Sequence, residues 1–343
     1  MFGKYALALA VTVTVAAVGG HGAAAAAAPA RPAPATPPQL GAAVNTVMLA
    51  GGDGRYVRTL LGHYASVTPE YEMEMSQLEP ARDRFDFARA DRIVRFGARH
   101  GLPVRGHTLV WDEMVPAWVG AGHPTRPQLL QILHHYIQTV VAHYRGRVEE
   151  WDVVNEPLLT DGSLRRSIWE RVIGPGYIAL AFRWAHQADP GAALFVNEYG
   201  AEWRDAKEQA LHRLVAGLRR AHVPVSGVGF QAHLRLDAHP PQAEFAGVLA
   251  SFARLGMRLE VTELDVRAGG RAPLAQRLTE EAAIYRSVAA ACRAVPACVR
   301  ITTWGVTDAA SWLGESQRGL PFDASYRPKP AWRALAAALS RRG

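Results

Sequence analysis

Short apolar runs alternate with longer amphipathic stretches along most of the chain. The runs predict eight strands, at 41–44, 65–68, 103–110, 148–155, 193–197, 227–231, 258–263 and 300–304. The stretches between them predict helices, for example at 87–100, 126–144 and 208–222, and the first has a broad apolar stripe. Eight strand–helix units in about 300 residues match the number and size of a (β/α)8 barrel.

The alternative α/β architecture is a doubly wound sheet. No G-x-G-x-x-G motif follows the first predicted strand, so the sequence lacks the usual dinucleotide signature of that fold. We therefore predict the α/β fold class, as a single (β/α)8 TIM barrel that forms one catalytic domain over residues 40–343.

The first residues have the pattern of an export signal. Lys4 precedes an apolar run at 6–18, and small residues follow it at 19–30. This run is too short to span a membrane, which takes about 20 residues. We expect a secretory signal peptide at 1–28 and a Pro/Ala-rich linker at 29–39. The protein would be secreted, to the periplasm or outside the cell, without membrane attachment after the signal is removed.

Composition narrows the classes of partner. The chain is 49% hydrophobic and 20% charged, which is enough apolar material for a buried core. Its net charge of +7 comes from dispersed arginines rather than a basic cluster with interleaved aromatic residues, so we expect no nucleic-acid partner. Cys292 and Cys298 can form a local disulfide in an oxidising compartment. Half of a metal site is the alternative, but no second Cys/His pair accompanies them.

Candidate chemistry lies where the apolar runs end. In barrels of this type the catalytic residues follow the carboxyl ends of the strands. The polar and aromatic residues there are Glu70, His107, Trp111, Asn155, Glu156, Asn197, Gln231, His233, Glu263 and Trp304. A buried carboxylate is costly unless it is paired. Two glutamates that end the fourth and seventh predicted strands therefore indicate a functional pair.

Two carboxylates among tryptophans indicate glycoside hydrolysis. One protonates the leaving oxygen and the other attacks the sugar, and a separation of about 5–5.5 Å predicts retention of configuration. This chemistry needs no cofactor and no metal. The adjacent His134 and His135 point in different directions on a predicted helix, so we interpret them as ordinary helix residues.

The motifs around these residues resemble glycoside hydrolase family 10, the endo-1,4-beta-xylanase family. The matching segments occur in the family's order: VTPEYEM (67–73), RGHTLVW (105–111), WDVVNEPL (151–158), GPGYIALAF (174–182), GVGFQAHL (227–234), VTELDV (261–266), ITTWGVTDAASW (301–312) and PKPAW (328–332). The resemblance covers residues 40–340. It also places a disulfide at Cys292 and Cys298.

The resemblance implies a role for each site residue. Glu156 would be the acid/base and Glu263 the nucleophile. Asn155 would bind the 2-hydroxyl of the sugar, and His233, oriented by Asp265, would contact the nucleophile. The implied substrate-binding residues also include Glu70, His107, Trp111, Tyr199, Gln231, Trp304 and Trp312. The partner would be a polysaccharide or oligosaccharide, most simply xylan, and the enzyme would be a monomer.

The sequence departs from the family pattern in one region. The usual ENEMKW is EYEMEM here, which places Tyr71, Glu74 and Met75 at changed positions. Asp112, Met114 and Leu313 also differ from the pattern. These positions hold the sugars on the non-reducing side of the cleaved bond in relatives. Two alternatives therefore remain open: a retaining glycosidase of the same fold that acts on another β-linked glycan or glycoconjugate, and a carbohydrate-binding protein without turnover.

Overall fold

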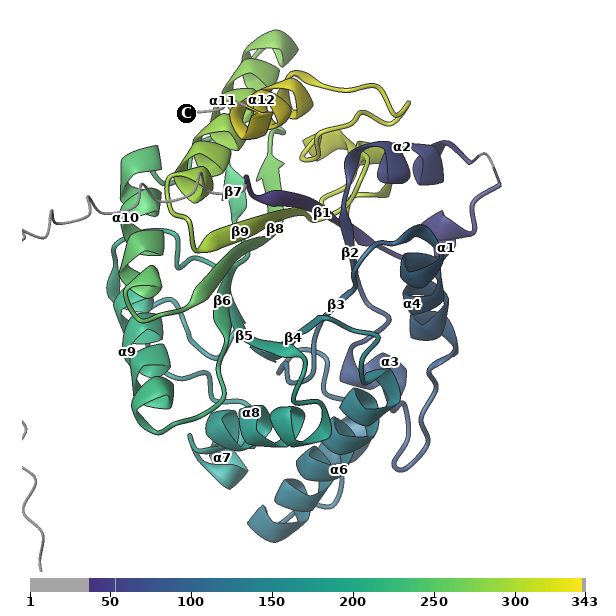
Figure 1. The fold of residues 1–343 in the computed structure, drawn as a ribbon, viewed down its shortest axis with the longest axis vertical. Helices are drawn as coiled ribbons and strands as arrows, with labels where there is room; N and C mark the ends of the chain where they lie inside the picture. The colour runs from purple at the N-terminus through teal and green to yellow at the C-terminus, as the bar shows by residue number, and fades with distance from the viewer. Residues whose placement is uncertain (1–36, 53, 341–343) are drawn as a thin grey trace, which may run out of the picture. The chain divides into compact units, whose positions relative to one another are not determined.

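Eight parallel strands form a nearly closed ring with helices around it (Figure 1). The computed structural model describes residues 37–52 and 54–340. Within these residues the ring strands are β1 (Gln39–Val44), β2 (Ser66–Pro69), β3 (Arg105–Gly106), β4 (Glu150–Asn155), β5 (Ala193–Glu198), β6 (Gly227–Phe230), β8 (Arg258–Arg267) and β9 (Cys298–Thr303). Their order is β2-β1-β9-β8-β6-β5-β4-β3, and a parallel bridge between Val67 and Val104 joins the two ends. This confirms the predicted (β/α)8 barrel.

Helices cover the outside of the ring (Figure 1). The longer ones are α2 (Arg55–His63), α4 (Ala88–His100), α6 (Arg126–Tyr144), α8 (Tyr177–Ala188), α9 (Ala206–Arg220), α10 (Gln242–Ala253), α11 (Leu274–Arg293) and α12 (Pro330–Ser340). The short ones are α1 (Thr46–Leu49), α3 (Met75–Leu78), α5 (Ala117–Gly120) and α7 (Ile168–Ile173), with 3-10 turns at Asp308–Ala310 and Glu315–Gln317.

Local sequence signals explain where two of these helices begin and end. At the start of α6 the N–H of Thr125 donates to Gln128 Oε1 at 2.8 Å, as in a capping box. Helix α4 ends at Gly101, whose φ of 67° is the left-handed conformation that glycine adopts easily. The helices predicted at 87–100, 126–144 and 208–222 are therefore found within about two residues of their expected ends.

Strand β3 is shorter than the predicted run at 103–110. Regular pairing covers Arg105–Gly106, and the chain then stays beside β4 through the isolated bridge between Val110 and Val154. The Asp152 carbonyl accepts both the Thr108 hydroxyl at 2.8 Å and the Leu109 N–H at 3.0 Å. A separate short strand, β7 (His233–Arg235), pairs with the far end of β8 and was not predicted.

The middle of the barrel is charged. Arg105 Nη1 lies 2.8 Å from Glu260 Oε2, and Arg258 Nη2 lies 3.0 Å from Glu150 Oε2. Arg105 also pairs with Asp152, which contacts His107 at the mouth of the barrel. Buried charges are tolerated when they are paired. This cluster of ion pairs holds neighbouring strands together inside the barrel and, through Asp152, contacts His107.

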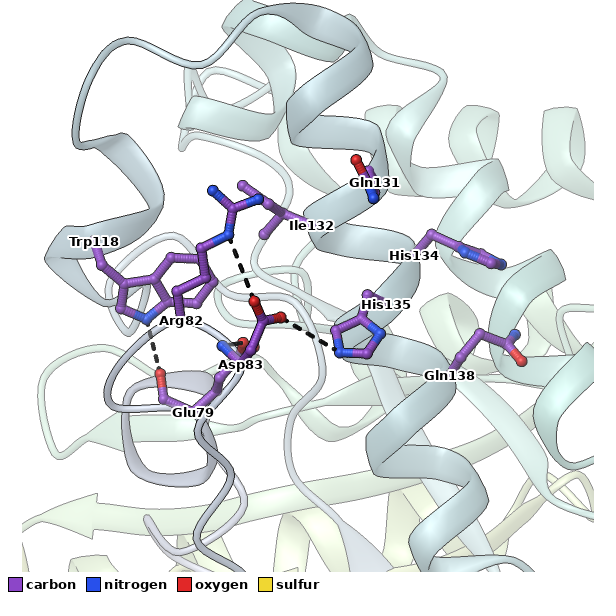
Figure 2. Close-up of a pocket in the computed structure, with 9 residues that line it drawn as sticks. All are labelled: Glu79, Arg82, Asp83, Trp118, Gln131, Ile132, His134, His135 and Gln138. Carbon is purple, nitrogen blue, oxygen red and sulfur yellow. Dashed lines mark hydrogen bonds and ion pairs between the residues drawn. The ribbon is translucent and has the colours of Figure 1, made fainter.

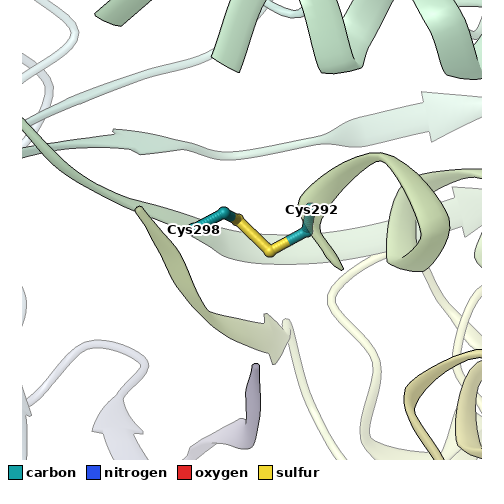
Figure 3. The surroundings of a disulfide bond; sticks show 2 residues. All are labelled: Cys292 and Cys298. Carbon is teal, nitrogen blue, oxygen red and sulfur yellow. A yellow bond between two sulfur atoms is a disulfide. The ribbon is translucent and has the colours of Figure 1, made fainter. Parts of the chain in front are cut away.

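The predicted disulfide is present. Cys292 at the end of α11 is bonded to Cys298 at the start of β9, with the Cα atoms 5.2 Å apart (Figure 3). The proposed signal peptide at 1–28, and the linker as far as residue 36, lie outside the described residues. Among the helices that are described, none is long and apolar enough to cross a membrane.

Candidate active site

The carboxyl ends of the barrel strands surround an open cavity of about 520 Å³. Every predicted catalytic and substrate-binding residue lines it: Glu70, His107, Trp111, Asn155, Glu156, Tyr199, Gln231, His233, Glu263, Trp304 and Trp312. Residues distant in the sequence are therefore brought together at the end of the barrel where the strand-end pattern places them.

Both carboxyl oxygens of Glu263 have hydrogen-bonding partners. Asn197 Nδ2 donates to Oε1 at 2.6 Å, and His233 Nε2 lies 2.9 Å from Oε2. The other ring nitrogen of His233 lies 3.0 Å from Asp265 Oδ1. Burial opposes protonation of the ring, but the charges of Asp265 and Glu263 outweigh it and raise the pKa of His233 well above its usual value. A raised pKa favours the protonated ring, in which each nitrogen donates to one of the two carboxyl groups.

Asp265 also fixes the rim of the cavity. Its Oδ2 accepts a hydrogen bond from Trp312 Nε1 at 2.6 Å. The Trp312 side chain is 49% exposed, and its ring meets that of His233 edge to face at 5.1 Å. An exposed aromatic face at the edge of a polar cavity is suited to packing against a sugar ring.

Glu156 lines the same cavity from the end of β4, three strands from β8 in the ring. Its backbone has a φ of 54°, in the left-handed region, immediately after strand β4. Gln231 Nε2 donates to its Oε1 at 3.1 Å. Burial and the charge of Glu263 raise the pKa of Glu156 above its usual value. A raised pKa suits a carboxyl group that has to hold a proton for the leaving oxygen.

Asn197 lies at a predicted strand end, and the sequence assigned it no role, but the structure places it between the two site residues Asn155 and Glu263. Its Nδ2 contacts Glu263 and also donates to Asn155 Oδ1 at 2.8 Å. Its own oxygen accepts from the Thr262 hydroxyl at 2.6 Å. A Cβ on Gly229 would lie 2.3 Å from this oxygen, so glycine is required there. Asn197 therefore sets the relative positions of Asn155 and Glu263.

His107 completes the ring of polar groups. Its Nδ1 lies 3.0 Å from Asp152 Oδ2 and 3.9 Å from Glu263 Oε1. Burial lowers its affinity for a proton, but the hydrogen bond to Asp152 and the charge of Glu263 raise the pKa of His107 overall. The ring of Trp304 meets it edge to face at 5.2 Å.

One wall of the cavity consists of Glu70, Tyr71 and Glu74, and we call it the acidic wall. Glu74 is buried, and its Oε2 has no hydrogen-bonding partner. Burial raises the pKa of Glu74 to about 7, with His107 opposing and Glu72 and Glu263 adding to the shift. Burial also raises the pKa of Glu70 to about 7, although Glu70 accepts from Asn45 Nδ2 at 2.9 Å.

The other changed positions lie elsewhere. Met75 is buried in the core. Asp112, Met114 and Leu313 are not among the described residues that line the cavity, whereas Glu113 is. The expected change of sugar contacts is therefore concentrated in Tyr71 and Glu74, because the chain after Trp111 presents Glu113 in place of Met114.

Trp203 and Arg235 also line the cavity, and the strand-end rule did not select them. Trp203 lies in the loop after β5 and Arg235 at the end of β7, so neither residue ends a predicted strand.

A second cavity, of about 380 Å³, lies on the outside of the barrel against α6 (Figure 2). Trp118 Nε1 donates to the carbonyl of Glu79 at 2.8 Å, and His135 Nε2 lies 3.6 Å from Asp83. His134 packs edge to face on Trp184. Within the described residues no group of three or more His, Cys, Asp or Glu side chains is arranged to hold a metal. This cavity contains none of the strand-end residues.

A family model, curated relatives and a solved structure all match the chain to one family of glycosyl hydrolases. The model of Glycosyl hydrolase family 10 matches residues 33–338. Endo-1,4-beta-xylanase B of Thermotoga neapolitana is 36% identical, over 82% of this chain and 82% of its own length. An endo-1,4-beta-xylanase of Agaricus bisporus is 36% identical, over 83% of this chain and 86% of its own. The structure of xylanase 10B from Thermotoga petrophila RKU-1 in complex with xylobiose superposes with a TM-score of 0.85 at 35% identity, covering 88% and 93% of the two chains.

Proposed function

The chain belongs to glycosyl hydrolase family 10, and from this membership we propose that it is a secreted endo-1,4-beta-xylanase that cleaves xylan with retention of configuration. The observation that carries the proposal is the contrast between the two facing carboxyl groups. Glu156 has a raised pKa and accepts amide hydrogen bonds at Oε1 alone, from Gln231 at 3.1 Å and Asn155 at 3.4 Å, whereas Glu263 has shorter contacts at both oxygens, at 2.6 and 2.9 Å. The raised pKa suits Glu156 to hold a proton, and the contacts at both oxygens hold the Glu263 carboxyl group in place as the nucleophile.

In the first step a Glu263 oxygen attacks the anomeric carbon while the glycosidic bond breaks. Glu156 gives its proton to the departing oxygen, so the leaving group is a neutral alcohol. The product is a glycosyl ester of Glu263. Asn155, whose Oδ1 accepts from Asn197 Nδ2 at 2.8 Å, would bind the 2-hydroxyl of the sugar, a contact that strengthens in the transition state.

In the second step Glu156 acts as a base. It takes a proton from water, the water oxygen attacks the anomeric carbon, and the bond to Glu263 breaks. Two inversions give net retention. Because Glu263 is neutral while it carries the sugar, the electrostatic cause that raises the pKa of Glu156 is removed when Glu156 has to be an anion.

Xylan is the substrate that the relatives support. Two curated relatives above 35% identity are endo-1,4-beta-xylanases, and one structural neighbour binds xylobiose. Trp304 and Trp312 provide aromatic surfaces in the cavity, and His107 and Gln231 provide polar contacts for hydroxyls. The cavity is open, which suits an internal attack on a long chain.

A specific observation favours a second candidate, a glycosidase of the same fold that acts on another β-linked glycan. The acidic wall presents a buried Glu74 oxygen without a partner where a bound sugar would lie. A third candidate, a binding protein without turnover, has no such support, because both carboxyl groups that the chemistry needs line the cavity.

A substrate panel tests the proposal. Purified protein is incubated with xylan, mixed-linkage glucan and aryl glycosides, and the products are separated by size. We expect short β-1,4-linked xylo-oligosaccharides from xylan, and NMR of the first-formed product should show the β-anomer. Cleavage of another glycan alone would support the second candidate, and no cleavage of any glycan would contradict both.

Secretion is part of the same proposal and has its own test. The apolar run at 6–18 and the following small residues support an export signal. Expressed in a secreting bacterial host, the mature protein should be recovered outside the cytoplasm with an N-terminus near residue 29. Full-length protein retained in the cytoplasm would contradict this.

A further inference from the structure

The chain after β4 folds back on Glu156 as a small hairpin. Leu158 and Leu164 form an antiparallel bridge, and Leu159 N donates to the carbonyl of Ser163 at 2.8 Å. Gly162 at the turn has a φ of 82°, and a Cβ there would lie 2.6 Å from the Ala206 carbonyl. The return strand ends with Arg165, whose N–H donates to the Pro157 carbonyl at 2.8 Å. The hairpin thus places Arg165 beside Glu156, the first residue after β4.

The Arg165 side chain makes three contacts at the cavity. Nε donates to the backbone carbonyl of Glu156 at 2.9 Å, and Nη2 lies 3.5 Å from Glu156 Oε2. Nη2 also donates to the Tyr199 hydroxyl at 3.4 Å. The side chain is 17% exposed, so water has limited access to these contacts. One guanidinium therefore links the backbone of Glu156, its carboxyl group and an aromatic residue that lines the cavity.

The backbone of Glu156 needs such support. A φ of 54° is unfavourable for a residue with a side chain. The N–H of Glu156 donates to the Asn197 carbonyl at 2.9 Å, and its own carbonyl accepts from Arg165. Both backbone groups of this left-handed residue are thus held: the N–H by the last residues of β5, which continue the pairing with β4, and the carbonyl by the Arg165 side chain.

The charges around the Glu156 carboxyl group come from several elements. Glu263 on β8 and Glu113 after β3 oppose its ionisation. Glu198 on β5 interacts with it electrostatically, but Lys207 on α9 pairs with Glu198 at 2.9 Å and lies 3.2 Å above the Tyr199 ring. Within the described residues, Arg165 is the cation that forms an ion pair with Glu156.

We propose that Arg165 is a positioning residue of the proton donor: it holds Glu156 in the left-handed conformation and stabilises the ionised carboxylate that the second step requires. This rests on the proposed role of Glu156. In the first step the charge of Glu263 offsets the effect of Arg165 and Glu156 keeps its proton. In the second step Glu263 is esterified and uncharged, and the charge of Arg165 then stabilises the ionised base without opposition from Glu263.

Three variants separate charge from packing. Arg165→Gln keeps a donor for the carbonyl and removes the charge, Arg165→Met removes both, and Arg165→Lys keeps the charge. Arg166→Gln is the matched control, because Arg166 is 74% exposed and pairs with Glu170 at 3.1 Å away from the cavity. The readout is the pH profile of kcat/KM, whose alkaline limb reports ionisation of the acid in the free enzyme.

Loss of the charge should make Glu156 hold its proton to higher pH. We expect the alkaline limb to move up by about 0.5–1.5 pH units in Arg165→Gln and Arg165→Met, as for removal of a nearby opposite charge. Arg165→Lys should restore the wild-type limb, and Arg166→Gln should not move it. With a good leaving group, kcat of the neutral variants should fall about tenfold with a burst of released aglycone, because the second step becomes limiting.

A merely structural role would give a different result. Loosening the hairpin would expose Glu156 to water, and its limb would then move to lower pH. A downward shift, no shift in either folded neutral variant, or the same shift in Arg166→Gln would overturn the inference. Glu156→Gln separates the two proposals: if this variant keeps the wild-type limb, the proposed role of Glu156 fails, and the inference fails with it. If the limb belongs to Glu156 but does not respond to Arg165, only the inference fails.

Discussion

The proposed catalytic centre, around Glu156 and Glu263, and the acidic wall both contain buried carboxyl groups, but these groups have different hydrogen-bonding partners. In the proposed catalytic centre Glu263 has hydrogen-bonding partners at both oxygens, Asn197 and His233. In the acidic wall Glu74 is buried with one oxygen that contacts no donor. The two groups lie in one cavity and influence each other electrostatically.

This difference suggests that Glu263 serves the reaction and that Glu74 serves the recognition of a ligand. A buried carboxyl group with hydrogen-bonding partners at both oxygens has its polar atoms satisfied before any ligand arrives. A buried carboxyl group without a partner has a cost of desolvation that a proton or a ligand has to relieve. The chain itself thus supplies the hydrogen-bonding partners of Glu263. The partner of Glu74 Oε2 would have to come from a bound ligand.

The largest expected effect comes from removing the catalytic carboxyl groups. Glu263→Ala should abolish turnover of every substrate, since no covalent step remains. Glu156→Ala should lose activity on xylan but keep much of its activity on aryl glycosides with very good leaving groups, because these need no proton. Steady-state kinetics across a series of leaving groups checks this. Equal losses on all of them in Glu156→Ala would contradict the division of roles.

The next effect concerns the acidic wall. If Tyr71 and Glu74 have lost two sugar contacts, kcat/KM on xylotetraose should be about tenfold to a hundredfold below that of relatives with the usual residues, at about 0.5–1.5 kcal/mol per contact. Tyr71→Asn combined with Glu74→Lys should recover part of this deficit. Met114→Gln is the control and should change little, because Met114 does not line the described cavity. Wild-type activity already equal to that of relatives, or a further loss in the double variant, would count against a changed wall.

A stability measurement examines the same wall without substrate. The pKa of Glu74 is about 7 instead of its usual 4.5. As the pH rises, Glu74 therefore loses its proton in the unfolded chain before it does so in the folded protein. The contribution of protonated Glu74 to the free energy of unfolding is complete below pH 4.5 and is lost as the pH rises through 7. Glu74→Gln should accordingly stabilise the protein by about 1–3 kcal/mol at pH 8 relative to pH 5. Denaturant unfolding at both pH values measures this, with exposed Glu113→Gln as the control; equal effects at both pH values would show that Glu74 is not strained by its charge.

The smallest effect on activity is expected far from both regions, at the disulfide. The bond closes a short loop between α11 and β9 and should stabilise the fold by about 2–3 kcal/mol. Reduction should lower Tm by about 5 °C and leave activity at room temperature nearly unchanged. A large loss of activity in reduced protein that is still folded would show that the loop matters to the cavity.

The alternation of apolar runs was sufficient to predict the barrel, because eight strand–helix units of that length have few other arrangements. The strand-end rule likewise selected Glu156, Gln231 and Glu263, since parallel strands bring their carboxyl ends together. It also flagged Asn197, but sequence could not show that one amide contacts both Asn155 and Glu263, because this contact depends on the register of three strands.

Two features depend on loops and were beyond periodicity. Arg165 reaches Glu156 only because the hairpin after β4 turns at Gly162. The chain after Trp111 presents Glu113 to the cavity in place of Met114, which a linear comparison of motifs could not reveal. Both follow from the path of the backbone after a strand has ended, where side-chain direction no longer alternates.

Azide rescue of the two alanine variants on an activated aryl glycoside distinguishes the nucleophile from the acid/base. In Glu263→Ala azide should attack in place of the missing carboxylate and give a glycosyl azide of inverted, α configuration. In Glu156→Ala azide should instead intercept the glycosyl ester of Glu263 and give the β-azide. NMR of the isolated azides distinguishes the two products. If the configurations are exchanged between the variants, the assignment of Glu263 as nucleophile and Glu156 as acid/base is wrong.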